Sequence, residues 1–448
     1  MADKKRMLLS AAIDFGTTHS GYAFSFNFED NPDPLKIPTN RLWVAEGISS
    51  LKAPTCVLLS PEQEFMAFGY EAEDLYSEMA LDGNHHDHYF FEGFKMFLYE
   101  TNSLQKLSKA LIRDGIGKQV PALDLFAHVI RYLKNHMLSA LDTKGIKVYN
   151  KEIHWVLPVP AKWKKSGKQF MREAANKAGI LTEQLTLCVD SEVALLYSQR
   201  IPSTSLMGSP VTQSFLSFSP EAKIMIIDLG GKTVDIIIYQ KQSNETYEEL
   251  HQPTGGPWGG TKVNEAFYQM IIKIVGASCF QKFKDDFKAD DQDIHRDLEM
   301  KKRKINPESN SKITIKIPFS LLKTFEKETG EKMKEVIQQT HYANKITCRT
   351  QCFRMEADLF KELFREPINM LVEHLQQLMA KDNLSDVSTL LMVGGFSESH
   401  MMLDAVKNAF PAKRVIVPVD AGLAVLKGAV LFGHRSNYAL EPNPPGLL

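Results

Sequence analysis

Cysteine is scarce in this sequence. Only five of the 448 residues are cysteines, namely Cys56, Cys188, Cys279, Cys348 and Cys352. A small, odd and scattered set of cysteines argues against the disulfide framework of a small secreted domain and favours a reducing, cytoplasmic setting. The last two cysteines have no second pair nearby, so we expect reduced thiols there rather than a zinc site.

Long apolar runs and a surplus of one charge are also missing. No uninterrupted run of roughly 18 apolar residues occurs, so the sequence predicts no membrane span. The 53 basic and 54 acidic residues give a net charge of −1, which argues against nucleic acid or an anionic membrane as the main partner. The start, MADKKRMLLSAAID, has the basic and apolar character of a secretion signal, but its apolar stretch is short and is needed for a predicted strand.

One pattern occurs twice in the sequence. IDFGTTHSGYAF begins at Ile13, and IIDLGGKTVDII begins at Ile226. In each, an apolar strand ends in Asp-x-Gly, turns through small or hydroxylated residues and continues as a second strand. Glycine lets such a turn approach a ligand closely, and backbone amides with threonine hydroxyls can bind phosphate. The sequence therefore predicts two phosphate-binding β-hairpins.

A carboxylate stands at the mouth of each predicted turn. Asp14 and Asp228 would repel a bare phosphate, but they suit a hydrated Mg²⁺ that lies between protein and phosphate. The two aspartates are 228 − 14 = 214 residues apart. We therefore expect two related lobes that hold a nucleotide and Mg²⁺ in a cleft between them.

The length fits two lobes of roughly 200 residues each. Residues 201–221 contain six serines and three prolines, which is typical of a connector or a surface insertion. We predict lobe I at residues 1–205 and 418–448, a connector at 206–221 and lobe II at 222–417. No C-terminal substrate-binding domain is expected, because only 14 residues follow His434.

Alternating strands and helices between the hairpins predict a mostly parallel sheet covered by helices. Pro121 is expected to open a helix, and HWVLPVP from His154 is expected to be a strand. A helix ended by Gly179 follows, and a long helix is expected from about Ala357 to Met379. The first of these helices is predicted from apolar residues spaced three and four apart: Leu123, Phe126, Ile130, Leu133 and Met137.

Three further motifs complete the pattern: GGPWGG at 255–260, LMVGGFSES at 391–399 and AGLAVLKGAVLFGH at 421–434. With the two hairpins, they make the chain resemble the seventy-kilodalton heat-shock proteins of the actin-like ATPase superfamily, and most of all the 12A/12B branch of that family. The resemblance runs from about Leu8 to His434. It implies an α/β, actin-like ATPase fold, in which two duplicated lobes with mixed sheets flanked by helices surround a nucleotide cleft.

The resemblance also implies which residues bind the phosphates. It assigns the first phosphate motif to Asp14, Gly16, Thr17 and Thr18, with His19 beside it, and the second to Asp228, Gly230, Gly231, Lys232, Thr233 and Asp235. Lys95, in FEGFKMF, falls where the family has a lysine over the γ-phosphate, and Pro160 falls on the proline hinge. The implied catalytic residues are Lys95, Asp190, Asp228 and Thr233. Asp14 and Asp228 are expected to hold Mg²⁺ through water.

Two other segments resemble the part of the family's site that binds the nucleoside. Gly394 and Gly395 match the turn beneath the α-phosphate and adenosine. Glu299, Lys302 and Arg303 match the clamp on ribose and adenine, where a cationic pair can stack on the nucleotide and a carboxylate can accept ribose hydroxyl bonds. The expected ligands are therefore ATP or ADP with Mg²⁺.

The chain departs from the family pattern at three positions. Asp190 stands where the family has a glutamate near the magnesium shell, His19 replaces an aromatic residue, and Lys232 replaces a glycine. Phosphoryl transfer depends on in-line placement of water and metal, so nucleotide binding tolerates such changes better than hydrolysis does. We expect the ammonium of Lys232 to point into the cleft.

Several functions stay open. The sequence favours an ATP-binding conformational switch with slow hydrolysis, whose state is read by an unidentified protein partner. The alternatives are a non-catalytic nucleotide-binding interaction protein, a small-molecule kinase and an actin-like filament protein. The sequence argues against a P-loop at LGGKT, because Ile226 stands where the required glycine would be and a strand rather than a helix is expected to follow.

Three local motifs have more than one interpretation. GGPWGG is either a further phosphate turn or a tight loop. The basic run Lys301–Lys304 is either the nucleotide clamp, a solvated helix face or an import signal. The histidines at 85, 86 and 88 are expected in an exposed polar loop rather than in a metal site.

Overall fold

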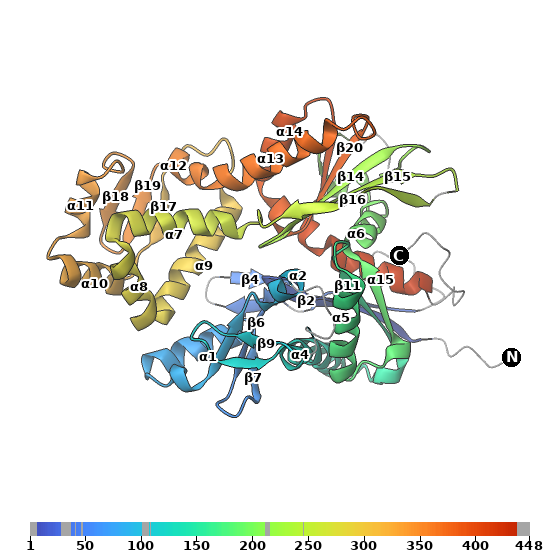
Figure 1. The fold of residues 1–448 in the computed structure, drawn as a ribbon, viewed down its shortest axis with the longest axis horizontal. Helices are drawn as coiled ribbons and strands as arrows, with labels where there is room; N and C mark the ends of the chain where they lie inside the picture. Colours follow the sequence, from blue (N-terminus) through green and yellow to red (C-terminus); the bar gives the residue numbers. More distant parts are fainter. Residues whose placement is uncertain are drawn as a thin grey trace.

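Two mixed β-sheets form the centres of two lobes (Figure 1). The computed structural model describes residues 7–27, 37–40, 42–45, 48–100, 107, 109–210, 216–244 and 246–436. Residues 211–215 of the expected connector and residues 437–448 of the expected first lobe lie outside this part. The α/β fold with mixed sheets and flanking helices is confirmed.

The first sheet has the strand order β12-β11-β1-β2-β5. Its strands are β1 Leu9–Asp14, β2 His19–Phe26, β5 Ala53–Pro54, β11 Ile153–Val159 and β12 Leu185–Val189. β1 pairs antiparallel with β2 and parallel with β11, and β11 pairs parallel with β12. The predicted first hairpin and the predicted strand at HWVLPVP are therefore confirmed.

Helices cover both faces of this sheet, so its strands are apolar on both sides. On one face lie α4 Ala122–Asp142 and α5 Lys165–Lys177, which share a core with Ala11 and Ile13. On the other face lie α6 Asp190–Ser198 and α15 Ala424–Ser436, which share a core with Ala12. The helix predicted after Pro121 is α4, which buries Phe126, Ile130, Leu133 and Met137 and leaves Leu123 half-buried.

The second sheet has the order β13-β21-β20-β14-β15-β16. Its strands are β13 Leu206–Gly208, β14 Lys223–Leu229, β15 Val234–Lys241, β16 Tyr247–Gly256, β20 Thr389–Val393 and β21 Arg414–Pro418. β14 pairs antiparallel with β15 and parallel with β20, as β1 does with β2 and β11. The two sheets therefore repeat one arrangement around the two predicted hairpins. β13, at the start of the expected connector, pairs with β21, while the lobe boundaries themselves stay predictions.

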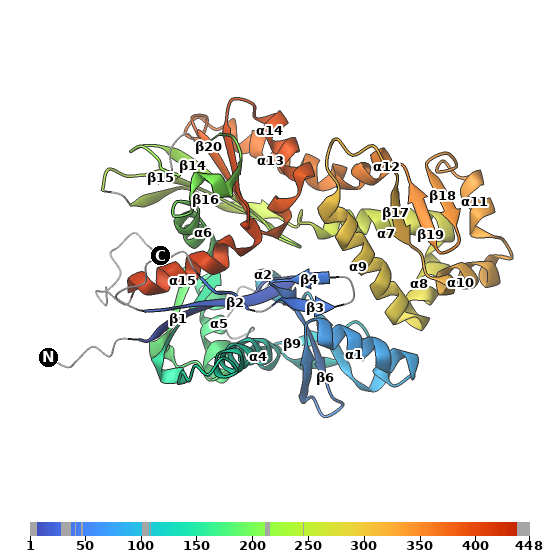
Figure 2. The same ribbon diagram turned by 180° about the vertical axis from the view of Figure 1, so that it is seen from behind.

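Each lobe carries an outer part. In the first lobe these elements are β3 Trp43–Ala45, β4 Ile48–Ser50, β6 Cys56–Leu59, β7 Phe65–Phe68, α1 Tyr70–Leu81, β8 Tyr89–Glu92, α2 Phe97–Glu100, β9 Leu111–Arg113 and β10 Gln119–Pro121. In the second they are α7 Thr261–Val275, α8 Ala277–Asp286, α9 Lys288–Lys304, β17 Ile313–Lys316, α10 Phe319–Thr329, α11 Met333–Gln339, β18 Ile346–Arg349, β19 Cys352–Met355 and α12 Ala357–Lys361. Helices α1 and α9 face each other across the lobes, and α15 lies between the two sheets (Figures 1 and 2).

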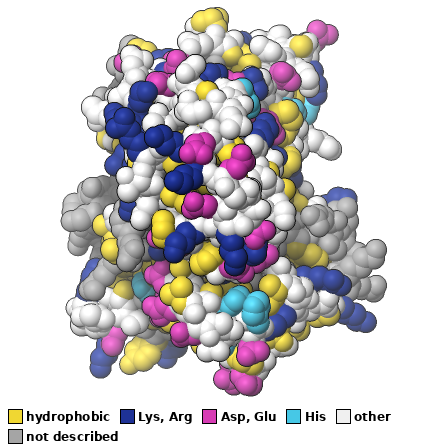
Figure 3. All heavy atoms as spheres, turned by 90° about the vertical axis from the view of Figure 1, so that its left-hand side faces the viewer, with side chains coloured by type: hydrophobic (Ala, Val, Ile, Leu, Met, Phe, Trp, Pro, Cys, Tyr) yellow, Lys and Arg dark blue, Asp and Glu magenta, His cyan; other side chains and the backbone are white. Residues whose placement is uncertain are grey.

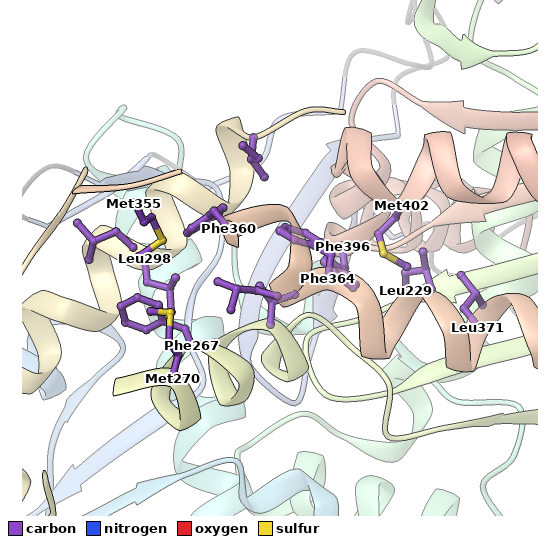
Figure 4. Packing of buried hydrophobic residues seen from close by; sticks show 14 of the residues in the cluster. Leu229, Phe267, Met270, Leu298, Met355, Phe360, Phe364, Leu371, Phe396 and Met402 are labelled. Carbon is purple, nitrogen blue, oxygen red and sulfur yellow. The ribbon is translucent and has the colours of Figure 1, made fainter. Parts of the chain in front are cut away.

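The expected uninterrupted helix from Ala357 to Met379 is wrong. The chain forms α12, then a 3₁₀ turn at Glu362–Phe364, and then α13 Arg365–Met379. Pro367 explains the break, because proline cannot donate the backbone hydrogen bond that would join it to the preceding turn and its ring crowds that turn. The turn places the Phe364 ring 6.2 Å from that of Phe396, inside the main core of the second lobe (Figure 4).

The outer ends of the two lobes carry charges of both signs. Figure 3 shows this face of the molecule, on which basic, acidic and hydrophobic side chains are mixed over both lobes. Among the described residues, no helix combines the length and the apolar character needed to cross a membrane. All five cysteines are free thiols.

Candidate functional site

A cleft of about 930 Å³ lies between the lobes and is lined from both sides. The predicted hinge residue Pro160 lies on its wall, and so do all of the predicted site residues. These are Asp14, Gly16, Thr17, Thr18, His19, Lys95, Asp190, Asp228, Gly230, Gly231, Lys232, Thr233, Asp235, Glu299, Lys302, Arg303, Gly394 and Gly395. The structure thus brings every predicted site residue to one place, while the roles assigned to them stay predictions.

The first turn is shaped by two hydroxylated side chains. The Gly16 amide donates to Ser20 Oγ at 3.1 Å, and the Gly16 carbonyl accepts from Thr55 Oγ1 at 3.0 Å. The amide of Thr55, directly after β5, donates to the Thr18 carbonyl at 2.8 Å and braces the turn from outside. These bonds fix the backbone and leave Thr17 and Thr18 on the cleft wall.

The second turn is braced by the GGPWGG loop. The amides of Gly259, Gly260 and Thr261 donate to the carbonyls of Lys232, Gly230 and Gly231 at 3.1, 3.1 and 2.8 Å. Since these amides are used inside the protein, the end of this motif is a supporting loop and not a further phosphate turn.

The two turns touch across the cleft. A Cβ atom added to Gly231 would lie only 2.1 Å from Thr18 Oγ1, so this position has no room for a side chain. Gly394 has a φ of +85°, and a Cβ there would meet Asp228 Oδ1 at 2.2 Å. The glycines therefore let three segments converge on the place where the phosphates are expected.

Lys232 extends across the cleft toward lobe I. Its Nζ would lie 2.1 Å from a Cβ atom added to Gly93, which stands two residues before Lys95. Lys95 itself is buried, and its Nζ lies 5.2 Å from the centroid of the Trp163 ring. Two ammonium groups from different lobes therefore approach the phosphate side of the cleft.

Two carboxylates of the site are already ion-paired. Lys52 Nζ lies 2.5 Å from Asp14 Oδ2, and Lys162 Nζ lies 2.6 Å from Asp235 Oδ1. Lys52 lines the cleft and was not among the predicted site residues. No motif marks it, because its role depends on how the segment before β5 lies against β2.

Asp228 and Asp190 form no such ion pair with any residue that the structure describes. Burial, together with the charges of Asp235 and Asp14, raises the pKa of Asp228 to about 7. Burial also raises the pKa of Asp190 well above its usual value, although the nearby Lys95 opposes this. Both carboxylates would therefore be stabilised by a further cation.

The donor set fits Mg²⁺ only in part. Asp190 Oδ1 is buried without a hydrogen-bond partner among the described residues, which leaves an acceptor for a water of the metal's shell. The described residues contain no group of three His, Cys, Asp or Glu side chains that could hold a metal directly. Asp14, one of the two predicted metal residues, is already paired with Lys52.

The predicted nucleoside clamp forms a tight polar cluster. Lys302 pairs with Glu299 and donates to Asn264 Oδ1 at 3.0 Å and to the Gly260 carbonyl at 3.1 Å. Asn264 Nδ2 donates to Glu299 Oε1 at 2.8 Å. Burial alone would raise the pKa of Glu299, but the charges of Lys302 and His295 and the hydrogen bonds from Lys302 and Asn264 together outweigh burial and lower that pKa to about 2. Lys302 is therefore a buried anchor rather than a solvated surface cation.

His19 lies at the same side of the cleft. Burial lowers its pKa to about 4, and the positive charges of Arg303, Lys52 and Lys302 add to this effect, although Glu299 opposes it. The imidazole is therefore neutral near pH 7 and can offer one donor and one acceptor to a ligand.

The outer end of the cleft is bridged by α1 and α9. Arg296 donates to Glu73 at 3.1 Å and to Asp74 at 2.6 Å, and Ser77 Oγ donates to Gln292 at 3.1 Å. These contacts join residues more than 200 positions apart, so no sequence pattern indicated them.

One of the three histidines at 85, 86 and 88 is buried. His85 is 4% exposed and lies in a 3₁₀ turn, with its ring 5.5 Å from that of Tyr76. The expectation of an exposed loop is therefore wrong for this residue. Aromatic packing at α1 explains its burial.

The comparisons with known proteins agree with this architecture. Heat shock 70 kDa protein 12B from Homo sapiens is 34% identical over 94% of this chain and 68% of its own length. The chain belongs to the heat shock protein 70 family. Heat shock 70 kDa protein 12A from Homo sapiens is 33% identical over 97% of this chain and 70% of its own length, so the 12A/12B resemblance is confirmed. Chaperone protein DnaK from Mycoplasma mycoides is a more distant relative, with 22% identity over 72% of this chain and 48% of its own.

No protein-family model matches the chain. It is nonetheless a heat shock protein 70-like protein, and membership of this family supports nucleotide binding by the cleft.

Proposed function

We propose that this protein binds ATP and ADP with Mg²⁺ in the cleft between its lobes and works as a nucleotide-dependent conformational switch with slow ATP hydrolysis. The observation that carries the proposal is the convergence of both phosphate hairpins on one cleft of about 930 Å³. A cleft of this size is suited to a ligand as large as a nucleotide.

Each group of residues has a role in this proposal. Thr17, Thr18 and Thr233 offer hydroxyl donors to the phosphate oxygens, and Lys95 and Lys232 offer charge-assisted bonds to them. Asp14 and Asp228 hold the water shell of the metal. Bound Mg²⁺ would supply positive charge between the phosphate oxygens and the cleft carboxylates.

Phosphoryl transfer needs the attacking water in line with the bond that breaks and the metal at the phosphate oxygens. We propose that hydrolysis is slow because this site places the water less well. Asp190 is one methylene shorter than the family's glutamate at this place. Its carboxylate therefore reaches less far toward the reacting water, while Lys95 stays available to stabilise the charge that develops on the γ-phosphate.

The switch follows from the position of the ligand between the lobes. A nucleotide that contacts both hairpins favours the closed arrangement, in which Arg296 of α9 joins Glu73 and Asp74 of α1. A protein partner of unidentified nature would read this closure. We also propose a cytoplasmic location, which the five free thiols support.

The second candidate is a non-catalytic nucleotide-binding interaction protein. The Lys52–Asp14 ion pair favours it, because the pair occupies a carboxylate that the metal needs in a hydrolytic site. Single-turnover hydrolysis of ATP separates the two candidates. Release of phosphate supports the switch with slow hydrolysis, and its absence with retained binding supports the second candidate.

Binding itself is tested by thermal unfolding of nucleotide-free protein with Mg·ATP, Mg·ADP or neither. A ligand at a hundred times its dissociation constant stabilises a protein by about 2.7 kcal/mol, which raises the midpoint of unfolding measurably. AMP at the same concentration is the control, because it lacks the β- and γ-phosphates. No shift with either nucleotide at millimolar concentration would contradict the proposed function.

A further inference from the structure

The Lys52–Asp14 ion pair is built into the first phosphate hairpin. Asp14 ends β1, and in the β1–β2 register it stands opposite Gly21. Lys52 precedes β5, which pairs with β2 through His19 and Pro54. Lys52 is thus held at the edge of the hairpin, on the same side as the turn.

Gly21 opens the path of the lysine. A Cβ atom added to Gly21 would lie 3.0 Å from Lys52 Cγ, so the stem of the lysine runs over the glycine to reach Asp14. The side chains of Lys52 and Asp14 are 19% and 16% exposed. Both line the cleft, so the exposed part of the pair faces the place of the phosphates.

The pair changes the charge that a nucleotide meets. A divalent metal at a polyphosphate neutralises phosphate oxygens and separates them from the carboxylates of the protein. The Lys52 ammonium already pairs with the Asp14 carboxylate, and it has two further N–H donors beyond the one used by Asp14. Lys95 and Lys232 line the same cleft, so three ammonium groups surround the predicted phosphate site.

We propose that Lys52 is a built-in cation of the phosphate site, which bridges Asp14 and the polyphosphate and lets nucleoside di- and triphosphates bind with little dependence on a divalent metal. The inference rests on the proposed nucleotide binding. The Lys52 ammonium then offsets the repulsion between the Asp14 carboxylate and the phosphates when no metal is bound. It also makes Mg²⁺ a competitor of Lys52 for Asp14.

The chain offers a matched control. Lys162 forms an ion pair of nearly the same length with Asp235, and its side chain is 22% exposed, close to the 19% of Lys52. Asp235 lines the cleft, but Lys162 is not among the residues that line it. Removing Lys162 therefore removes a similar lysine–aspartate pair without removing a donor that faces the phosphates.

The experiment is isothermal titration calorimetry with ADP, in excess Mg²⁺ and in excess EDTA. For the wild-type protein we expect the two dissociation constants to differ by less than about threefold. For Lys52→Met, which leaves Asp14 unpaired, we expect EDTA to weaken ADP binding by at least about tenfold while binding in Mg²⁺ remains. Lys162→Met is expected to behave as the wild type, and Lys52→Arg, which keeps the positive charge, is expected to remain resistant to EDTA.

The outcomes separate this inference from the proposed function. ADP binding by the wild type in Mg²⁺ that disappears in EDTA overturns the inference and leaves the proposed function intact. An equal response of Lys52→Met and Lys162→Met to EDTA also overturns it, since the effect would not be specific to the pair that lines the cleft. No binding of ADP in either buffer overturns both. Because the first comparison uses only the wild-type protein, the test does not depend on the folding of any variant.

Discussion

Asp228→Asn should stabilise the nucleotide-free protein, and more so at high pH than at low pH. Asp228 stands opposite Asp235 in the β14–β15 register, and like charges at directly opposed positions of an antiparallel pair destabilise it. Burial and the neighbouring Asp235 and Asp14 raise the pKa of Asp228 from 3.8 to about 7. The site therefore holds an ionised carboxylate at a cost to folding that an amide of the same shape avoids.

The sign follows from the two pKa values. The folded-state pKa lies above the unfolded value, so the stability linked to this group is complete below about pH 4 and is lost as the pH rises toward about 7. Between about pH 5 and about pH 8 the ionised group costs roughly a further 2 pKa units, or about 2.7 kcal/mol. One side of the carboxylate faces the cleft and its solvent, so we expect a smaller difference of about 1 to 2 kcal/mol.

The assay is urea unfolding of the wild type and of Asp228→Asn at both pH values, in EDTA and without nucleotide. Asp235→Asn is the matched control, because it removes the opposing charge of the same hairpin but leaves Lys162 without its partner. We expect a gain for Asp228→Asn at pH 8 that shrinks at pH 5, and no such gain for the control. A gain of equal size at both pH values, or a loss at pH 8, would refute the electrostatic reasoning.

Three further predictions concern the ligand. Lys232→Gly should lower the preference for ATP over ADP by about tenfold or more, because a charge-assisted bond is worth about 1.5 to 3 kcal/mol and ATP carries one more phosphate. Titration of both nucleotides checks this, and an unchanged ratio of the two dissociation constants would contradict it. Arg296→Ala should speed nucleotide release several-fold in stopped-flow displacement, since it removes the ion pairs that join α1 and α9. Lys282→Ala removes an exposed ion pair with Glu328 and should leave the rate of release unchanged. Lys95→Ala should slow single-turnover hydrolysis much more than it weakens binding; an unaltered turnover rate would show that this lysine has another role.

Local sequence patterns were sufficient for the central hairpins and for most of the cleft. Apolar runs ending in Asp-x-Gly identified β1–β2 and β14–β15, because the apolar strand residues, the turn residues and the carboxylate all lie within about a dozen consecutive residues. The spacing of Phe126, Ile130, Leu133 and Met137 identified α4 for the same reason. The duplicated hairpins also predicted a cleft between two lobes, whereas the assignment of Lys95, Asp190 and Glu299 to that cleft came from the resemblance to a known family.

Where the predictions failed, different causes acted. The break between α12 and α13 had a visible signal in Pro367, which the apolar periodicity of the segment outweighed. The burial of His85 had no such signal, since a polar run such as NHHDH is usually exposed, and the ring is covered by packing that includes Tyr76 of α1. Tertiary contacts decided this case.

Lys52 shows why the charge balance of such a site cannot be worked out from motifs alone. The motif containing Asp14 specifies a carboxylate at the turn, and that carboxylate by itself indicates a metal. Whether the carboxylate is free depends on a lysine 38 residues away, on the pairing of β2 with β5, and on a glycine at position 21 that leaves room for the lysine stem. Lys162 pairs with Asp235 across the lobes, but it does not line the cleft and is not expected to contact the phosphates. A phosphate motif thus fixes the position of the carboxylate, while a lysine from another segment that lines the cleft, here Lys52, decides how much positive charge a metal must supply.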